Sequence, residues 1–245
     1  MKYIIGITTV NRYPKRNYLK TTLKSLYLSG VFDRSDVRVV VSDSGSQNGL
    51  LHVCDYTKEY YMFWDMLEIL YSKEKISANA NRAKLLKHCV HTGAEFVIYM
   101  QDDVVVRPDF LTHVNSFITK YPEAIMWAFY ASYVEVLHCA ERGEDKWIYP
   151  HEKYYGSVCH ALRAQHAWGY ACELKRADRR EETCGGDILL TRWLKKCFPT
   201  RKIYASCPCY VQHIGEDSIL SESHGFRKNQ SFDKYFGESL KIIEN

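Results

Sequence analysis

The chain has 245 residues, of which 46% are hydrophobic and 25% charged, and it carries a formal net charge of +4. These fractions are typical of a soluble globular protein with a sizeable core, and the mild basic excess permits an anionic partner without requiring one. No run approaches the roughly 18 consecutive apolar residues of a membrane span, so a spanning helix is excluded. Because the chain begins in an apolar strand with no signal peptide, we expect a cytoplasmic protein, in a bacterium or in the host cell of a virus. The nine cysteines are an odd number, which together with the missing export signal favours reduced thiols.

Strand-like and helix-like segments alternate over residues 1–130. Short apolar or β-branched runs predict strands, and apolar residues repeating every three to four positions predict helices. The predicted strands are residues 3–8, 37–41, 67–71, 96–100 and 125–130. The predicted helices are residues 18–29, 50–66, 78–91 and a segment that starts at Pro108. This order is typical of right-handed βαβ units and predicts an α/β fold with a parallel sheet. Residues 133–165 are more irregular, and we interpret them as loops or short antiparallel strands that form an acceptor wall.

Two adjacent carboxylates, Asp102 and Asp103, follow directly after the apolar run at residues 96–100. In an open α/β sheet, ligands bind at the carboxyl ends of the strands. Adjacent carboxylates repel one another, so a partly buried pair favours a cation that could bridge them to a substrate phosphate. The alternative is a solvated turn before the Pro108 helix, since Asp is an ordinary turn residue.

Four stretches taken together resemble the GT-A nucleotide-sugar glycosyltransferases. They are ITTVNR at residues 7–12, VSDSGS at 41–46, NANRA at 79–83 and QDD at 101–103. Two later stretches also match: GGDILL at 185–190 resembles the segment that carries the catalytic Asp of inverting members, and YVQHIG at 210–215 is similar to the late His segment of the enzymes that branch N-glycans. The resemblance implies a single GT-A domain over residues 1–245, with a Rossmann-like, mostly parallel sheet and helices on both faces. Residues 1–130 would bind the nucleotide sugar, and residues 131–245 would bind the acceptor.

The resemblance also implies roles for individual residues. Asp43 would hold the nucleobase, and Asp103 and His213 would bind Mn²⁺ or Mg²⁺. Gln101 stands where the family has an acid, so it adds no charge and leaves Asp103 as the expected metal ligand. The donor, which we expect to be a UDP-sugar, would contact Thr8, Thr9, Asn11, Arg12, Asp43, Asn81, Arg82, Gln101 and Asp102.

On the acceptor side, the resemblance makes Asp187 the general base of an inverting transfer. It is expected in the first turn of a helix, where the macrodipole favours a carboxylate. The alternative is that Asp187 only caps this helix. Residues 166–170 are predicted to form an acceptor-side turn. The expected acceptor contacts are Trp168, Gly169, Tyr170 and Gly186.

Basic residues gather in residues 12–24 and again in residues 175–202. Two such clusters beside a donor site suit an anionic acceptor, and duplex DNA that carries a hydroxymethylated base is one candidate. A cell-envelope or capsular glycan is the other candidate, and the clusters are also compatible with ordinary solvated helix faces. Two further classes of function stay open at this point: a metal-dependent nucleic-acid enzyme that uses Asp102 and Asp103, and a catalytically silent binding module.

Overall fold

The computed structural model describes residues 2–10, 18–46, 67–154, 157–182, 184–215 and 229–244. The predicted helix at residues 50–66, together with Asn11 and Arg12, lies outside them. The helices are α1 (Leu19–Leu28), α3 (Ala78–His91), α4 (Phe110–Lys120), α5 (Val134–Glu141), α6 (Ala164–Arg179), α7 (Gly186–Cys197) and α8 (Gln230–Glu244). The strands are β1 (Tyr3–Thr9), β2 (Val37–Asp43), β3 (Leu67–Leu70), β4 (Phe96–Gln101), β5 (Val104–Val106), β6 (Met126–Ala128), β7 (Lys146–Tyr149), β8 (Cys159–Arg163), β9 (Ile203–Ser206) and β10 (Val211–His213).

In the described part of the chain, eight strands form one sheet in the order β3-β2-β1-β4-β8-β6-β9-β7. The pairings that join β3, β2, β1 and β4 are all parallel, which confirms the predicted α/β fold for this half. The fifth predicted strand, now β6, runs parallel to β4 as expected but does not pair with it. β8 lies between β4 and β6 and is antiparallel to both, so the second half of the chain completes the sheet of the first.

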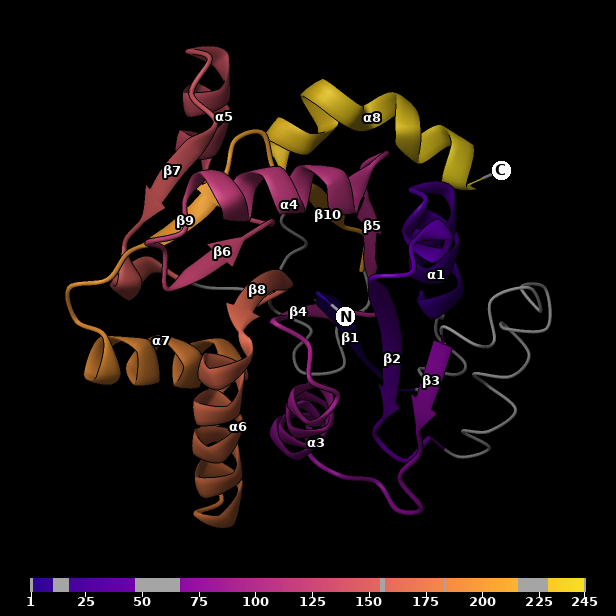
Figure 1. Ribbon diagram of the computed structural model, residues 1–245, viewed down its shortest axis with the longest axis vertical. Coiled ribbons are helices and arrows are strands. Elements are labelled where there is room, and N and C mark those ends of the chain that lie inside the picture. Colours follow the sequence, from indigo (N-terminus) through magenta and orange to yellow (C-terminus); the bar gives the residue numbers. More distant parts are fainter. Residues whose placement is uncertain are drawn as a thin grey trace.

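Helices cover both faces of the sheet, as Figure 1 shows. One core packs α1 and α4 against one face, and the other packs α3, α6 and α7 against the opposite face. Successive side chains of a strand point to opposite faces, so Ile98 of β4 joins the first core while Val97 and Tyr99 join the second. The apolar stripe predicted for α4 is confirmed, and its members are Phe110, Leu111, Val114, Phe117 and Ile118.

The predicted acceptor-side turn at residues 166–170 was wrong, because these residues form the first half of α6. The buried residues of α6 follow the helical period, and they are His166, Ala167, Tyr170, Ala171, Leu174 and Ala177. Gly169 suggested a turn, but here it allows close packing: an added Cβ would lie 2.7 Å from Cζ2 of Trp193 in α7. Of the region at residues 133–165, β7 and β8 are antiparallel strands as predicted, whereas helix α5 was missed.

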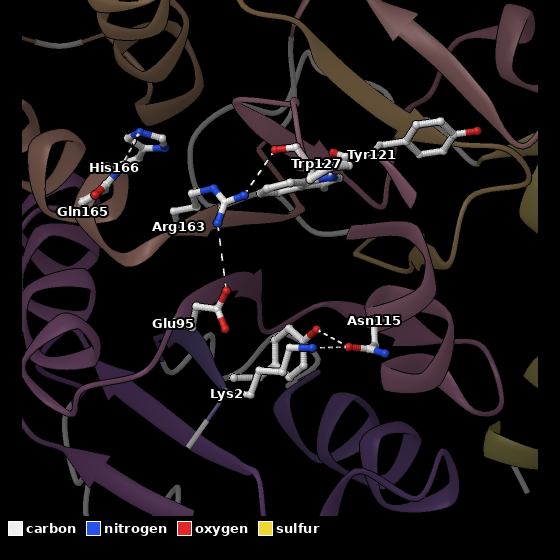
Figure 2. Close-up of polar contacts among 10 residues, drawn as sticks. Lys2, Glu95, Asn115, Tyr121, Trp127, Arg163, Gln165 and His166 are labelled. Atoms are coloured by element: carbon white, nitrogen blue, oxygen red, sulfur yellow. Dashed lines mark hydrogen bonds and ion pairs between the residues drawn. The ribbon is translucent and has the colours of Figure 1, made fainter. Parts of the chain in front are cut away.

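Polar contacts join α4 and β8 to the amino-terminal edge of the parallel strands (Figure 2). The Lys2 ammonium and the Tyr3 hydroxyl both donate to Oδ1 of Asn115, at 2.5 and 2.8 Å. Arg163, at the end of β8, lies 4.0 Å from the Glu95 carboxylate. These contacts fix the edge of the sheet opposite to the one where ligands bind in open α/β folds. Among the described helices, none combines the length and apolar character that a bilayer crossing needs.

Candidate functional site

The carboxylate of Asp102 lies at the carboxyl end of β4 and is almost completely buried. The Thr9 hydroxyl, at the end of β1, donates to Oδ2 of Asp102 at 2.6 Å. The Thr22 hydroxyl of α1 lies 2.7 Å from the carbonyl oxygens of both Asp102 and Val104, and it accepts from the Val104 amide. The acidic turn is therefore held from β1 and α1, and the predicted donor contact Thr9 supports Asp102 directly.

The structure brings the two expected metal ligands, Asp103 and His213, together. β10 pairs antiparallel with β5, so that His213 stands opposite Val104. Nε2 of His213 lies 3.2 Å from Oδ2 of Asp103, and the Ile214 amide donates to the Asp103 carbonyl at 2.8 Å. Gly215 leaves the space that this carboxylate needs, because a Cβ there would lie 2.4 Å from Oδ2 of Asp103. This close contact joins a segment near the end of the described chain to the acidic turn.

The donor set fits a divalent ion. A carboxylate oxygen and an imidazole nitrogen at this separation can occupy neighbouring positions around one ion, since ligands at about 2.1 Å in octahedral geometry lie about 3 Å apart. The residues that the structure describes contain no cluster of three or more His, Cys, Asp or Glu side chains that could hold a metal. Among the described residues, Asp103 and His213 are the pair that could contact a bound ion together.

Asp43, at the end of β2, closes its own turn. Its carboxylate accepts hydrogen bonds from the amides of Gly45 and Ser46, at 3.2 and 3.0 Å, and from the Ser46 hydroxyl at 2.5 Å. Gly45 has φ of 86°, and an added Cβ would lie 2.1 Å from the carbonyl oxygen of Glu74. Hydrogen bonds and close packing therefore hold residues 43–46, and the contact of Asp43 with a nucleobase stays a prediction.

Asn81, in the first turns of α3, is engaged by β2. Its side-chain amide donates to the carbonyl of Ser42 at 2.9 Å, and its Oδ1 accepts from the Ser42 hydroxyl at 2.7 Å. Both residues are buried. The amide of Asn81 thus ties the start of α3 to the sheet edge and sets the position of the neighbouring Arg82.

Arg82 is only 8% exposed and lies between two tyrosines. Its guanidinium carbon is 4.3 Å from the ring centroid of Tyr99, and Nη1 donates to the hydroxyl of Tyr170 at 3.2 Å. Within the described ranges, no carboxylate forms an ion pair with this guanidinium. Burial of a charge without a counterion is costly, so the position favours an anionic ligand.

Tyr170 continues this contact to α7, because its hydroxyl donates to the carbonyl oxygen of Gly186 at 2.6 Å. Burial raises the pKa of Tyr170 to about 12 although Arg82 opposes the shift, so the hydroxyl keeps its proton at neutral pH. Gly186 is the first residue of α7 and precedes Asp187. The predicted donor contact Arg82 and the predicted base Asp187 therefore meet at one point.

Asp187 lies in the first turn of α7, as predicted, and is half-buried. Its Oδ1 accepts from the Ile188 amide at 2.9 Å, and its carbonyl accepts from the Thr191 hydroxyl at 3.0 Å. Gly185 occupies the N-cap position, but the Asp187 carboxylate does accept a first-turn amide, so the general-base role and the alternative that Asp187 only stabilises the helix start both stay predictions.

Three residues of this cluster were missed from the sequence: Tyr99, Tyr154 and His160. Tyr99 shares a hydrogen bond of 2.8 Å with the Thr8 hydroxyl. Nδ1 of His160 lies 3.1 Å from the Ser157 hydroxyl and 3.3 Å from that of Tyr154. Burial, with Arg82 adding to it, lowers the pKa of His160 to about 3, so the ring is neutral. The alternation of β4 was a usable signal for Tyr99, because it places this residue on the face that α3 covers.

The structure does not bring Trp168 to this cluster. Trp168 is 39% exposed. Its ring centroid lies 5.3 Å from that of His91 and 5.6 Å from Nζ of Lys87, near the carboxyl end of α3. The Arg82 cluster lies near the opposite end of the same helix. Gly169, the neighbour of Trp168, packs on Trp193 instead. Gln101 lies at the end of β4, and its backbone amide donates to the carbonyl oxygen of Val158.

Comparison with known proteins gives one family. The profile of glycosyl transferase family 2 matches residues 4–172, which is more than half of the chain. A search among curated proteins finds no significant match.

Several solved structures have a similar fold. Residues 1–349 of TarS from S. aureus, in complex with UDP, have a TM-score of 0.58 at 18% identity, over 86% of this chain and 60% of that one. The mannosyltransferase PcManGT from Pyrobaculum calidifontis, with GDP-Man and Mn²⁺, gives 0.54 at 13%, over 84% and 56%. GalNAc-T7 with UDP, GalNAc and Mn²⁺ gives 0.61 at 11%, over 99% and 48%.

This chain therefore spans 48% to 60% of the length of those three solved chains. At these identities the likeness extends to the fold, which is of the GT-A, Rossmann-like type with a large and mostly parallel sheet. The family match is independent of that likeness. It runs without a break from β1 to the first half of α6. From the profile match, the chain belongs to glycosyl transferase family 2.

Proposed function

We propose that this chain transfers a sugar from a nucleotide-sugar donor to a hydroxyl group of an acceptor, with inversion at the anomeric carbon. Because the chain belongs to family 2, one further observation is enough to support this proposal. Three kinds of group converge at the carboxyl edge of the sheet: an acidic turn with a histidine, a buried arginine with no carboxylate partner in the described residues, and a carboxylate at a helix start. These are the groups that such a transfer needs for the leaving diphosphate and for the attacking hydroxyl.

Residues 1–130 would hold the donor, which we propose is a UDP-sugar. Arg82 would contact the diphosphate through a charge-assisted hydrogen bond, and the turn at residues 43–46 would bind the nucleobase. UDP in the solved structures of TarS and GalNAc-T7 supports a uridine donor, and GDP-Man in PcManGT makes a guanosine donor the alternative to test.

Asp103 and His213 would hold Mn²⁺ or Mg²⁺. A bound divalent ion neutralises the negative charge that develops on the leaving diphosphate. Mn²⁺ in the solved structures of PcManGT and GalNAc-T7 supports this assignment. Gln101 adds no charge to the acidic turn, the Asp102 carboxylate accepts from Thr9, and the Asp103 carboxylate is the one that lies near the histidine.

Residues 131–245 would hold the acceptor, with Asp187 as the base. A carboxylate oxygen of Asp187 would take the proton of the acceptor hydroxyl as its oxygen attacks the anomeric carbon and the bond to the diphosphate breaks. A single base that acts on the attacking group gives inversion. Gly186, which was expected to contact the acceptor, directly precedes Asp187, and the Tyr170 hydroxyl donates to the Gly186 carbonyl.

A thermal-shift screen tests the donor assignment. We expect UDP or a UDP-sugar together with Mn²⁺ to raise Tm, because a ligand that binds only the native state stabilises it by about 2.7 kcal/mol at a hundredfold excess over Kd. GDP and GDP-sugars form the comparison series, and Mn²⁺ alone is the control. A protein whose Tm responds to no nucleotide, with or without the ion, would contradict the proposal and reopen the reading as a silent binding module.

For the acceptor we propose duplex DNA that carries a hydroxymethylated base. The support is the group of exposed basic side chains at the carboxyl end of α6, close in sequence to Asp187: Lys175, Arg176, Arg179 and Arg180. Glu173 pairs with Arg176 and Arg180, whereas Lys175 and Arg179 form no ion pair with the residues that the structure describes. Those two cations are available for phosphates.

Gel shifts across a salt series test the DNA proposal. Replacing both Lys175 and Arg179 by glutamine should weaken DNA binding and reduce the slope of log K against log salt by about 2, since each lost phosphate contact removes about 0.9. The same change at Lys195 and Lys196, which are exposed near the other end of α7, is the matched control and should alter the slope less.

Sugar transfer to hydroxymethylated and to plain DNA completes this test. The target base must leave the duplex to reach Asp187, at a cost of a few kcal/mol, so single-stranded DNA should be modified at least as fast. Absence of DNA binding at low salt, together with transfer to a free saccharide or a lipid-linked glycan, would replace DNA by an envelope or capsular acceptor.

A further inference from the structure

The Tyr170 hydroxyl joins two parts of the site that come from different halves of the chain. It accepts a hydrogen bond from Nη1 of Arg82, on α3, and it donates one to the carbonyl oxygen of Gly186, on α7. Tyr170 itself lies on α6 and is fully buried. A single side chain therefore connects the expected diphosphate contact with the residue that precedes the expected base.

The direction of this hydrogen-bonded chain is fixed. A guanidinium can only donate, a carbonyl oxygen can only accept, and a tyrosine hydroxyl has one proton. The hydroxyl must therefore donate its proton to the Gly186 carbonyl and accept the hydrogen bond from Arg82. Hydrogen bonds in a chain polarise one another. A change in the electron density or position of the guanidinium therefore alters the strength of the hydrogen bond to the Gly186 carbonyl.

The packing around Gly186 makes the same connection sterically. A Cβ at residue 186 would lie 2.3 Å from Nη1 of Arg82 and 3.2 Å from the Tyr170 hydroxyl oxygen. The guanidinium thus rests on the bare backbone at the start of α7, with no side chain between them. A shift of the guanidinium toward a ligand must change what supports the first turn of α7, where Asp187 lies.

We expect the Arg82 guanidinium to move toward a bound donor. In the described residues its partners are the ring of Tyr99 and the hydroxyl of Tyr170, and neither is a counterion. A diphosphate would supply that counterion. The first turn of α7 also has a separate support, because the Thr191 hydroxyl contacts the carbonyl oxygens of Asp187 and Tyr154 at 3.0 and 3.3 Å. Loss of the Tyr170 hydroxyl should therefore not unfold the helix.

We propose that Tyr170 is a positioning residue that couples binding of the donor diphosphate at Arg82 to the placement of the Asp187 carboxylate. This inference rests on the proposed function, and it names the side chain through which the donor site and the base are connected. The Tyr170 hydroxyl is engaged by Arg82 and by Gly186, so it acts through these two residues and not directly on the acceptor. Its effect passes through the carbonyl of Gly186.

Hydrogen exchange with UDP and Mn²⁺ as the probe tests this coupling without any turnover. In the parent protein, the probe should slow exchange both in a peptide over residues 37–46 and in one over residues 184–194, the latter by at least about fivefold. In Tyr170→Phe, which keeps the buried ring and removes both hydrogen bonds, the first response should remain and the second should be lost. A role that is only structural would raise exchange in the variant equally with and without the probe.

Two variants complete the design. Gly186→Ala keeps the tyrosine but places a methyl group where Nη1 of Arg82 lies, so it should abolish the same response even if Tyr170→Phe does not fold. Tyr3→Phe is the matched control: it removes a buried tyrosine hydrogen bond, to Asn115, at the opposite edge of the sheet, and should keep both responses.

The outcomes separate the inference from the function on which it rests. A response at residues 184–194 that persists in both Tyr170→Phe and Gly186→Ala overturns the coupling, and so does a parent response confined to residues 37–46; either result leaves the donor assignment intact. A parent protein that responds nowhere overturns both. As a kinetic check, Tyr170→Phe should lower kcat by about tenfold to 10² in the parent and by much less in the Asp187→Asn background.

Discussion

Replacing Asp187 by asparagine is expected to lower kcat by about 10² or more, while the Kd of the nucleotide donor stays close to that of the parent. Asparagine has nearly the same shape and can still accept the hydrogen bond of the Ile188 amide, so the start of α7 should keep its structure. It cannot take a proton from the acceptor hydroxyl. Initial rates with saturating donor and acceptor, together with calorimetric titration of UDP in the presence of Mn²⁺, measure the two quantities.

Asp109→Asn is the matched control for this change. Asp109 is an exposed carboxylate at the start of another helix, α4, and its side chain makes no capping hydrogen bond. Its φ of 53° is a left-handed conformation that asparagine adopts readily, so folding should be unaffected. Turnover close to that of the parent in Asp187→Asn would remove this residue from the mechanism and would favour a transfer with retention.

Replacing Asp103 by asparagine is expected to abolish the gain in UDP affinity that Mn²⁺ gives. A neutral amide is a much weaker ligand for a hard divalent ion than a carboxylate is, and the ion and the nucleotide support each other's binding. The fold should persist, because the hydrogen bond from Ile214 to residue 103 uses the backbone carbonyl. Titrations of UDP with and without Mn²⁺ give the ratio of the two affinities, which should fall to about 1.

Two comparisons make the Asp103 result specific. His213→Gln removes the other expected ligand and should reduce the same ratio, whereas Asp109→Asn should keep it. Thermal unfolding of each variant in the absence of ligand shows whether the fold has been preserved. An unchanged ratio in Asp103→Asn would exclude this carboxylate as a metal ligand and direct attention to Asp102.

The elements that the sequence predicts well are those whose pattern is local. The buried stripe of α4 follows directly from the spacing of its apolar residues, and helix α3 covers the predicted residues 78–91. The place of β8 could not be predicted in this way. Nothing within residues 159–163 indicates that they pair antiparallel with β4, because strand order depends on contacts between distant segments.

The candidate site divides along the same line. Asp103 and His213 were paired through resemblance to a family, and the structure places them 3.2 Å apart. The contact of Arg82 with Tyr170 and Gly186 was not predicted, because it requires three helices to meet and residues 166–170 were interpreted as a turn. The helical period of the small and aromatic residues in α6 was present in the sequence, but Gly169 outweighed it.

The antiparallel insertion of β8 has a consequence for how the protein is made. During translation, β4 leaves the ribosome well before residues 159–163 exist, so one side of its backbone waits without a partner while synthesis proceeds at about 5–20 residues per second. An apolar strand with an open edge readily pairs with other chains. We therefore expect slow synthesis between β4 and β8 to favour aggregation of the nascent chain over correct closure of the sheet.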